Sequence, residues 1–137
     1  MIPLTVANEI AAHIRTIPAL SGRTDVGPTD QVNTPNAKIV LPELINFDQT
    51  YGRGSDRMTW PVLVLICKVD DRSLMSKVSE FCTGSGPKSI KTAIEGGTAY
   101  TSCDSVRVTS VRLDVVTWQG IDFQGALFEL DIFGSGT

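Results

Sequence analysis

The chain has 137 residues, of which 42% are hydrophobic, with 12 basic and 15 acidic side chains and a formal net charge of −3 at pH 7. These values are typical of one globular domain that can bury its own core, so we expect a single domain over residues 1–137. A protein that binds nucleic acid by neutralising phosphates normally carries an excess of basic residues. The acidic balance therefore argues against that class of function.

The histidine and cysteine content argues against a metal site. The chain has one histidine, His13, and three cysteines, Cys67, Cys82 and Cys103, without a C-x-x-C spacing. We interpret the cysteines as small buried hydrophobic residues in a reducing compartment, and we expect no metal, no cofactor and no disulfide framework. Because no apolar run reaches the about 18 residues of a membrane span and no signal-peptide pattern is present, we expect a soluble chain that is not exported.

The N-terminal segment predicts an amphipathic helix over residues 4–16. Pro3 suits a first helical turn, and branched apolar residues recur at i, i+4, i+8 and i+11 from Val6 onward. The opposite side carries Glu9 and His13, which we expect on a solvated face. A catalytic role for His13 would need a partner side chain that the sequence does not suggest.

Two polar segments predict long loops. Residues 21–37 are dominated by Gly, Pro, Thr, Asp and Asn, and residues 48–58 contain a glycine-hinged stretch with two arginines. Loops longer than about 12–15 residues are usually functional or disordered, so residues 21–37 are either a mobile flap or a contact with a neighbouring subunit, and we favour the contact. The second loop lacks a Gly-Lys-Ser/Thr motif, which favours a flexible hairpin tip over a phosphate-binding loop.

Two strands are predicted around the second loop. Lys38–Phe47 predicts a strand that Pro42 restricts to a sheet edge or a bulge. Thr59–Asp70 contains the most apolar run of the chain, Val62–Cys67, without polar alternation. Such a run is typical of a strand that helices or another subunit cover on both faces.

A helix pair is expected after the apolar strand. Asp70, Asp71 and Ser73 offer N-caps for a helix over residues 72–82. A short helix follows, with Pro87 at its first position and Ile90–Ile94 on its apolar side. The adjacent carboxylates could serve acid–base catalysis, but helix capping explains them first.

The last segment predicts a β-hairpin in which Ser105–Trp118 and Ile121–Phe133 are joined by Gln119–Gly120. This register pairs Trp118 with Ile121, Val116 with Phe123, Leu113 with Ala126, and Val111 with Phe128. The apolar residues change face near Val115 and Gly125. Because a phase change of one residue moves side chains to the opposite face, either the ribbon bends or bulges there, or its outer half packs on a partner subunit.

Several segments, taken in order, resemble the tail terminator proteins of long-tailed (siphovirus) actinobacterial phages. The segments are Val69–Arg72, Ser79–Phe81, Ser85–Glu95 and Phe123–Ile132, together with Trp60–Pro61 and the N-terminal helix. The resemblance spans most of the chain and depends on the order and spacing of these segments. It implies an α+β fold in which an N-terminal helix and a helix pair pack on a mixed or antiparallel sheet of about four strands.

The same resemblance implies a virion structural protein of the tail or neck without catalytic residues, assembled in the host cytoplasm. It implies a homo-oligomer, a hexameric ring that caps the tail tube, stops its polymerisation and provides the head–tail joining surface. The partners would be the major tail-tube protein and the head-closure or connector proteins, and the genome DNA would pass through the lumen without specific binding. Two alternatives stay open: another neck protein, such as a connector or head-closure protein, and a small hydrolase or ligand-binding domain that uses Asp70 and Asp71.

Two features of the sequence suggest where a subunit or tail-tube interface lies. The polar loops are longer than simple connections need, and the outer hairpin places apolar residues on a second face. The candidate contact residues are Tyr51, Arg53, Asp56, Arg57, Val116, Trp118, Ile121 and Phe123.

Overall fold

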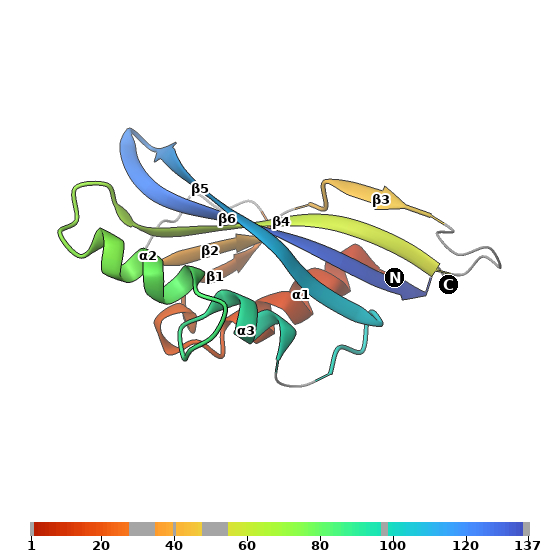
Figure 1. Cartoon of the computed structure of the whole chain (residues 1–137). Helices are drawn as coiled ribbons and strands as arrows, with labels where there is room; N and C mark the ends of the chain where they lie inside the picture. The colour runs from red at the N-terminus through yellow and green to blue at the C-terminus, as the bar shows by residue number, and fades with distance from the viewer. Residues whose placement is uncertain (1, 28–34, 40, 48–54, 97–98, 136–137) are drawn as a thin grey trace.

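A mixed β-sheet forms the centre of the fold, and the helices lie on one of its faces (Figure 1). The computed structural model describes residues 2–27, 35–39, 41–47, 55–96 and 99–135. The helices are α1 (Pro3–Ile14), α2 (Leu74–Cys82), α3 (Ile90–Glu95) and a short 3-10 helix (Pro18–Leu20). The strands are β1 (Thr24–Val26), β2 (Asn36–Ile39), β3 (Leu44–Asn46), β4 (Ser55–Lys68), β5 (Ser105–Trp118) and β6 (Ile121–Ser135).

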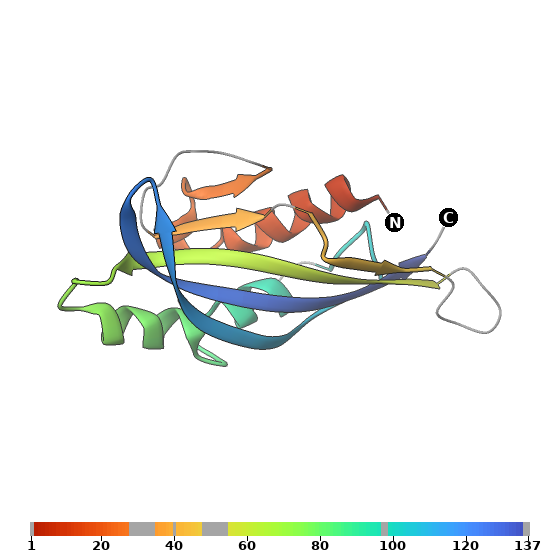
Figure 2. The ribbon, with the colours of Figure 1, turned by 90° about the horizontal axis from the view of Figure 1, so that it is seen from above.

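The sheet has the strand order β1-β2-β4-β6-β5, and β3 pairs with β4 next to β2. Only β1 and β2 run parallel among the described pairs, while β4, β6 and β5 form a long antiparallel ribbon that coils in space (Figure 2). The α+β class, the mixed sheet and the helices packed on it agree with the sequence-based expectation. The expected number of about four strands was too low, since the described residues form six.

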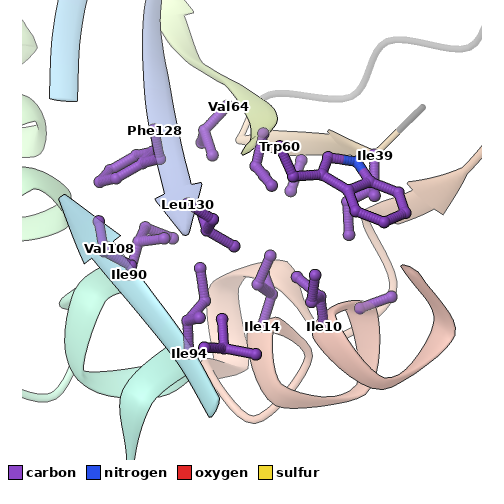
Figure 3. Close-up of a cluster of buried hydrophobic side chains, with 14 of the residues drawn as sticks. Ile10, Ile14, Ile39, Trp60, Val64, Ile90, Ile94, Val108, Phe128 and Leu130 are labelled. Atoms are coloured by element: carbon purple, nitrogen blue, oxygen red, sulfur yellow. The ribbon is translucent and has the colours of Figure 1, made fainter. Parts of the chain in front are cut away.

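Helix α1 confirms the predicted amphipathic helix, although it ends at Ile14, two residues earlier than predicted. Pro3 occupies the first turn, where its missing N–H costs no hydrogen bond. The buried side of the helix consists of Val6, Ala7, Ile10, Ala11 and Ile14. These residues pack against the sheet and against α3 (Figure 3).

The predicted strand Lys38–Phe47 divides into two strands in the structure. β2 and β3 both pair antiparallel with β4, Ile39 lying opposite Val62 and Leu44 opposite Thr59. The break between them therefore lies opposite Trp60 and Pro61 of β4.

Pro61 gives a physical reason for this break. Backbone N–H groups of residues i and i+2 point to the same side of a strand. The carbonyl of Thr59 accepts a hydrogen bond from the Glu43 N–H on the β3 side. A residue at position 61 would therefore direct its backbone N–H to the same side. Pro61 has no N–H, so this hydrogen bond cannot form. The neighbouring strand is interrupted where β4 cannot complete the ladder.

The structure places strands inside both segments that were predicted as long loops. Within residues 21–37, Thr24–Val26 forms β1 and pairs in parallel with residues 37–39 of β2. Within residues 48–58, Ser55 begins β4. Residues 28–34 and 48–54 lie outside the described residues. β1 and the first residues of β4 were not predicted because both segments have the composition of a loop. Their pairing partners are also distant in the sequence, and β1 pairs in parallel.

The helix pair after β4 is present with shifted starts. Helix α2 begins at Leu74 rather than at residue 72, and α3 begins at Ile90 rather than at Pro87. Ser89 sets the start of α3, because its hydroxyl accepts a hydrogen bond from the Thr92 N–H at 3.2 Å. The same hydroxyl donates to the carbonyl of Thr83 at 2.6 Å, which ties the end of α2 to the start of α3.

The two faces of β4 are covered differently. Val62, Val64 and Ile66 belong to the main core, which the helices cover (Figure 3). Leu65 is also fully buried but lies outside this core cluster. On the opposite face, Trp118 at the outer end of the hairpin lies over Lys38 of β2, which pairs with Leu63 of β4. Helices are thus confirmed as the cover of one face, and a second subunit as the cover of the other face stays a prediction.

The hairpin register agrees with all four predicted cross-strand pairs. Gln119 and Gly120 have φ values of 53° and 79°, the positive pair that a type I′ turn requires. The bulges fall at Val108/Ser110 and at Leu65/Cys67. The predicted change of face near Gly125 therefore arises from coiling of the ribbon, which turns the outer end of the hairpin over its own sheet.

Candidate functional site

The predicted contact residues of the loop tip are only partly described. Tyr51 and Arg53 lie outside the described residues, and Asp56 is buried. Arg57 forms a two-point ion pair with Asp131 of β6, with nitrogen–oxygen distances of 2.8 and 3.2 Å. Hydrogen bonding to Asp131 raises the pKa of the Arg57 guanidinium above its usual value. Arg57 is thus held by its own sheet, and its contact with a neighbour stays a prediction.

The four predicted contact residues of the hairpin differ in exposure. Phe123 is buried within the subunit, Val116 and Trp118 are half-buried, and Ile121 is exposed. The Lys38 ammonium lies 4.9 Å from the centre of the Trp118 ring, a cation–π contact. The outer hairpin therefore presents Ile121 to solvent and turns the other three side chains at least partly towards its own chain.

A buried polar cluster lies beneath Trp118 at the edge of the sheet. Lys38 lies 3.8 Å from a carboxylate oxygen of Asp25, and the Asn36 side-chain amide donates to the same oxygen at 3.2 Å. Lys38 and Asn36 are almost fully buried. The cluster joins β1, β2 and the hairpin end. Sequence analysis missed it because the three segments lie far apart along the chain.

Hydrogen bonds to Glu9 link α1 to the segment before β5. Its carboxylate accepts hydrogen bonds from the Thr101 N–H at 3.0 Å, the Ser102 N–H at 3.1 Å and the Thr101 hydroxyl. Desolvation raises the pKa of Glu9, but the hydrogen bonds from Thr101 and Ser102 outweigh it and hold the pKa below its usual value. Glu9 was expected on a solvated face, and the structure corrects that expectation because the carboxylate is a specific acceptor.

His13 also contacts the segment before β5 and is not a fully solvated side chain. Its ring stacks on Tyr100 at a centroid distance of 4.2 Å and an interplanar angle of 8°. Nδ1 of His13 lies 2.9 Å from the carbonyl oxygen of Glu9. The Tyr100 hydroxyl donates to the Ile94 carbonyl at 2.7 Å, and desolvation raises the pKa of Tyr100.

A cavity of about 560 Å³ opens beside the contacts of Glu9 and His13, between α1 and α3. Its polar lining includes Glu9, His13, Thr16, Thr92 and Thr101. The Glu9 carboxylate is occupied by three donors, and the Thr16 hydroxyl donates to the His13 carbonyl at 2.6 Å. These contacts hold α1 against the segments that border the cavity.

The adjacent acids Asp70 and Asp71 lie at the start of α2. One oxygen of Asp71 accepts from the Ser73 N–H at 2.7 Å, and the other accepts from the Lys77 ammonium at 2.8 Å. Hydrogen bonding to Lys77 lowers the pKa of Asp71. The N-cap residue of α2 is Ser73, without a side-chain cap hydrogen bond, so neither Asp70 nor Asp71 caps the helix. Asp71 instead binds the Ser73 N–H and pairs with Lys77.

All three thiols are disfavoured as nucleophiles. Burial raises the pKa values of Cys67 and Cys82, and it raises the pKa of Cys103 to about 11, with a further contribution from the charge of Glu9. Within the described residues, no group of three or more His, Cys, Asp or Glu side chains is placed to hold a metal ion.

We predict that no thiol of the native chain reacts quickly with Ellman's reagent at pH 7.5. The reactive species is the thiolate, which burial and the raised pKa values suppress. Labelling in urea should be at least tenfold faster than labelling of the native chain. Labelling of a native thiol at the rate of free cysteine would contradict this prediction.

Two apolar surfaces stand out among the residues that the structure describes. The first, here called the N-terminal groove, has a volume of about 490 Å³. It is lined by Pro3, Leu4, Ala7, Val26, Gly27, Leu41, Pro42 and Trp60. The second, here called the hairpin patch, surrounds a cavity of about 450 Å³ between α2 and the hairpin. Its apolar residues are Leu74, Met75, Val78, Leu113 and Val115. Neither surface includes the contact residues predicted from the sequence, although the hairpin patch uses the same hairpin.

None of the helices in the described part of the chain is long and apolar enough to cross a membrane. No protein-family model matches the chain, and no curated protein matches its sequence.

Proposed function

We propose that the chain is a structural subunit of a phage virion: a tail terminator that forms a homohexameric ring, caps the tail tube, stops its polymerisation and joins the tail to the head-closure proteins. The proposal comes from the ordered sequence resemblance described above. Its support from the fold is general: an α+β domain with helices on one sheet face and two exposed apolar surfaces.

The two unlike apolar surfaces are the structural observation that most favours the proposal. The N-terminal groove lies towards the end of the molecule that carries the N-terminus and β3, and the hairpin patch lies at the end with α2 and the β5–β6 turn (Figures 1 and 2). A contact between two different surfaces is head-to-tail, and such contacts generate closed rings when the rotation between copies closes. A subunit of a ring needs such a pair of surfaces.

The polar groups of the chain favour a structural over a catalytic role. Glu9, Tyr100 and Asp71 are engaged in hydrogen bonds that hold elements together. The net charge of −3 per copy suits a ring through which DNA must slide, since a lumen with a negative potential repels the duplex.

Polymerisation of purified tail-tube protein tests the proposed function. Added at a few copies per tube end, the chain should bind the ends and stop elongation, so that electron micrographs show shorter tubes with a cap. Tubes of unchanged length without bound protein would contradict the role as a terminator. Binding to head-closure protein without binding to tube ends would instead support the alternative neck protein.

A further inference from the structure

We infer that two copies of this chain join through the outer half of β5, which pairs antiparallel with the same strand of a second copy in a register centred on Leu113. The inference goes beyond the proposed function. The contact relates the two copies by a two-fold axis, so it joins copies that are not neighbours in one cyclic ring. It can be tested without any tail-tube protein.

The outer half of β5 lies at a free edge of the sheet. Among the described strands, β5 is the last in the order β1-β2-β4-β6-β5 and pairs only with β6 (Figure 1). Every residue from 109 to 115 is exposed. An exposed edge of this length offers backbone N–H and C=O groups to a further strand.

The backbone groups of alternate residues point to this edge. Hydrogen-bonded and non-hydrogen-bonded positions alternate along an antiparallel pair. The carbonyl of Asp114 points towards β6, where it accepts from the Gln124 side chain at 3.3 Å, whereas the N–H of Val115 donates instead to the Asp114 carboxylate at 2.9 Å. The N–H and C=O groups of Val111, Leu113 and Val115 therefore face the free edge.

The sequence of this edge is complementary to itself in antiparallel orientation. Residues 111–115 read Val-Arg-Leu-Asp-Val. With Leu113 opposite its counterpart in the second copy, Arg112 of each copy lies opposite Asp114 of the other. Val111 then lies opposite Val115, and the edge groups of all three apolar residues meet in hydrogen-bonded pairs.

The charges of Arg112 and Asp114 also select this register. Within the described residues, neither side chain is held in an ion pair. The two residues meet across the contact at non-hydrogen-bonded positions, where opposite side chains come closest. A shift of two residues in either direction would place Asp114 opposite Asp114 or Arg112 opposite Arg112. Like charges therefore disfavour both neighbouring registers.

The pairing places the exposed apolar side chains of the two edges side by side. Val111, Leu113 and Val115 are 36%, 51% and 53% exposed, and they lie on the face of β5 that borders α2. Three such side chains from each copy form one apolar strip across the contact. Because only five residues of each copy pair, the contact is at the small end of the range for specific interfaces, and we expect a weak, concentration-dependent dimer.

A disulfide at the two-fold axis tests the contact directly. Leu113→Cys places the two new thiols on opposed residues whose Cα atoms lie about 5.5 Å apart, a distance that a disulfide bridges. Ser85→Cys, on the exposed loop between α2 and α3, is the matched control. The wild type reports any cross-linking by the native thiols. All chains are oxidised mildly at equal concentration, and a denaturing gel without reductant measures the covalent dimer.

Charge reversal in the Leu113→Cys background distinguishes the inferred register from chance collision. Arg112→Asp or Asp114→Arg should each slow the cross-linking at least roughly tenfold, because like charges then meet at two places. The chain with both substitutions exchanges the two charges and should regain the rate, as should an equal mixture of the two single variants. Lys88→Asp makes the same change of charge on an exposed side chain outside β5 and should leave the rate unchanged. Thermal unfolding of each variant checks that it folds.

The Leu113→Cys chain should cross-link at least roughly tenfold faster than Ser85→Cys. Equal rates for these two, no slowing by the single charge reversals, or a doubly reversed chain that stays slow would overturn the inference. Weaker binding of Arg112→Asp to tail-tube protein with unchanged cross-linking would also overturn it, since the edge would then take a different protein. Tube capping by a chain that never pairs through β5 would refute only this inference. Pairing through β5 by a chain that ignores tube ends would refute only the proposed role as a terminator.

Discussion

Replacing Glu9 with alanine should lower the free energy of unfolding by about 2 kcal/mol. The carboxylate accepts from the N–H groups of Thr101 and Ser102 and from the Thr101 hydroxyl, and hydrogen bonds to a charged group are each worth about 1.5–3 kcal/mol. We place the total near the lower end because the site is partly exposed and water can replace the lost acceptor. Glu9→Gln keeps one carbonyl acceptor and should cost about half as much. Urea denaturation measures both.

The pH dependence of this contribution follows from the lowered pKa of Glu9. A carboxyl group whose pKa is lower in the folded state stabilises the fold fully above its unfolded pKa, near 4.5. The stabilisation is lost as the pH falls through the lower, folded pKa. The stability difference between wild type and Glu9→Gln should therefore be constant above about pH 5.5 and shrink below pH 4.5. A difference that does not change with pH would show that the charge of Glu9 is not involved.

Replacing Gly125 with valine should cost about 3 kcal/mol of unfolding free energy. A Cβ atom at this position would lie 2.9 Å from Cγ2 of Val116, 3.3 Å from the carbonyl oxygen of Asp114 and 3.4 Å from Cδ1 of Leu63. The glycine thus allows the hairpin to coil closely over the sheet, and overpacking typically costs about 1–3 kcal/mol, more for a branched side chain against backbone.

Gly84→Val is the matched control for this substitution. A Cβ atom at Gly84 would meet nothing within 4 Å, so we expect a change within about 0.5 kcal/mol. Urea unfolding followed by tryptophan fluorescence compares the two variants and reports on Trp60 in the core and Trp118 at the hairpin end. Equal stabilities would contradict the close approach of the hairpin to the sheet.

The hairpin and α1 could be predicted because their signals are local. Apolar residues at helical spacing define α1, and four apolar pairs across a two-residue turn define the register of β5 and β6. The same pairs showed that the ribbon changes face near Gly125. They could not show what the outer half packs against, because that depends on where β2 lies in space.

The missed features all depend on contacts between distant segments. Glu9 and Thr101 are 92 residues apart, so nothing near Glu9 in the sequence marks it as an acceptor. β1 is only three residues long and pairs in parallel, which leaves no turn or alternation to detect. The exposed surfaces were missed for the same reason: the N-terminal groove combines α1, the end of β1 and the segment around Leu41.

The exposure of the candidate contact residues also depends on contacts between distant segments. The interface that the sequence assigns to the outer hairpin, at Val116, Trp118, Ile121 and Phe123, stays a prediction. The structure shows that Trp118 covers Lys38 of its own chain, while the exposed apolar side chains there are Ile121, Leu113 and Val115. Burial in the tertiary structure decides which apolar residues remain available, and the sequence pattern alone does not contain that information.

The mass of the purified wild-type assembly tests most directly our proposal that this chain is a ring-forming structural subunit. Native mass spectrometry at micromolar concentration should show a closed oligomer, at six times the 14.8 kDa mass of one copy for a hexamer. A single species at 14.8 kDa, both alone and with tail-tube protein, would contradict the claim.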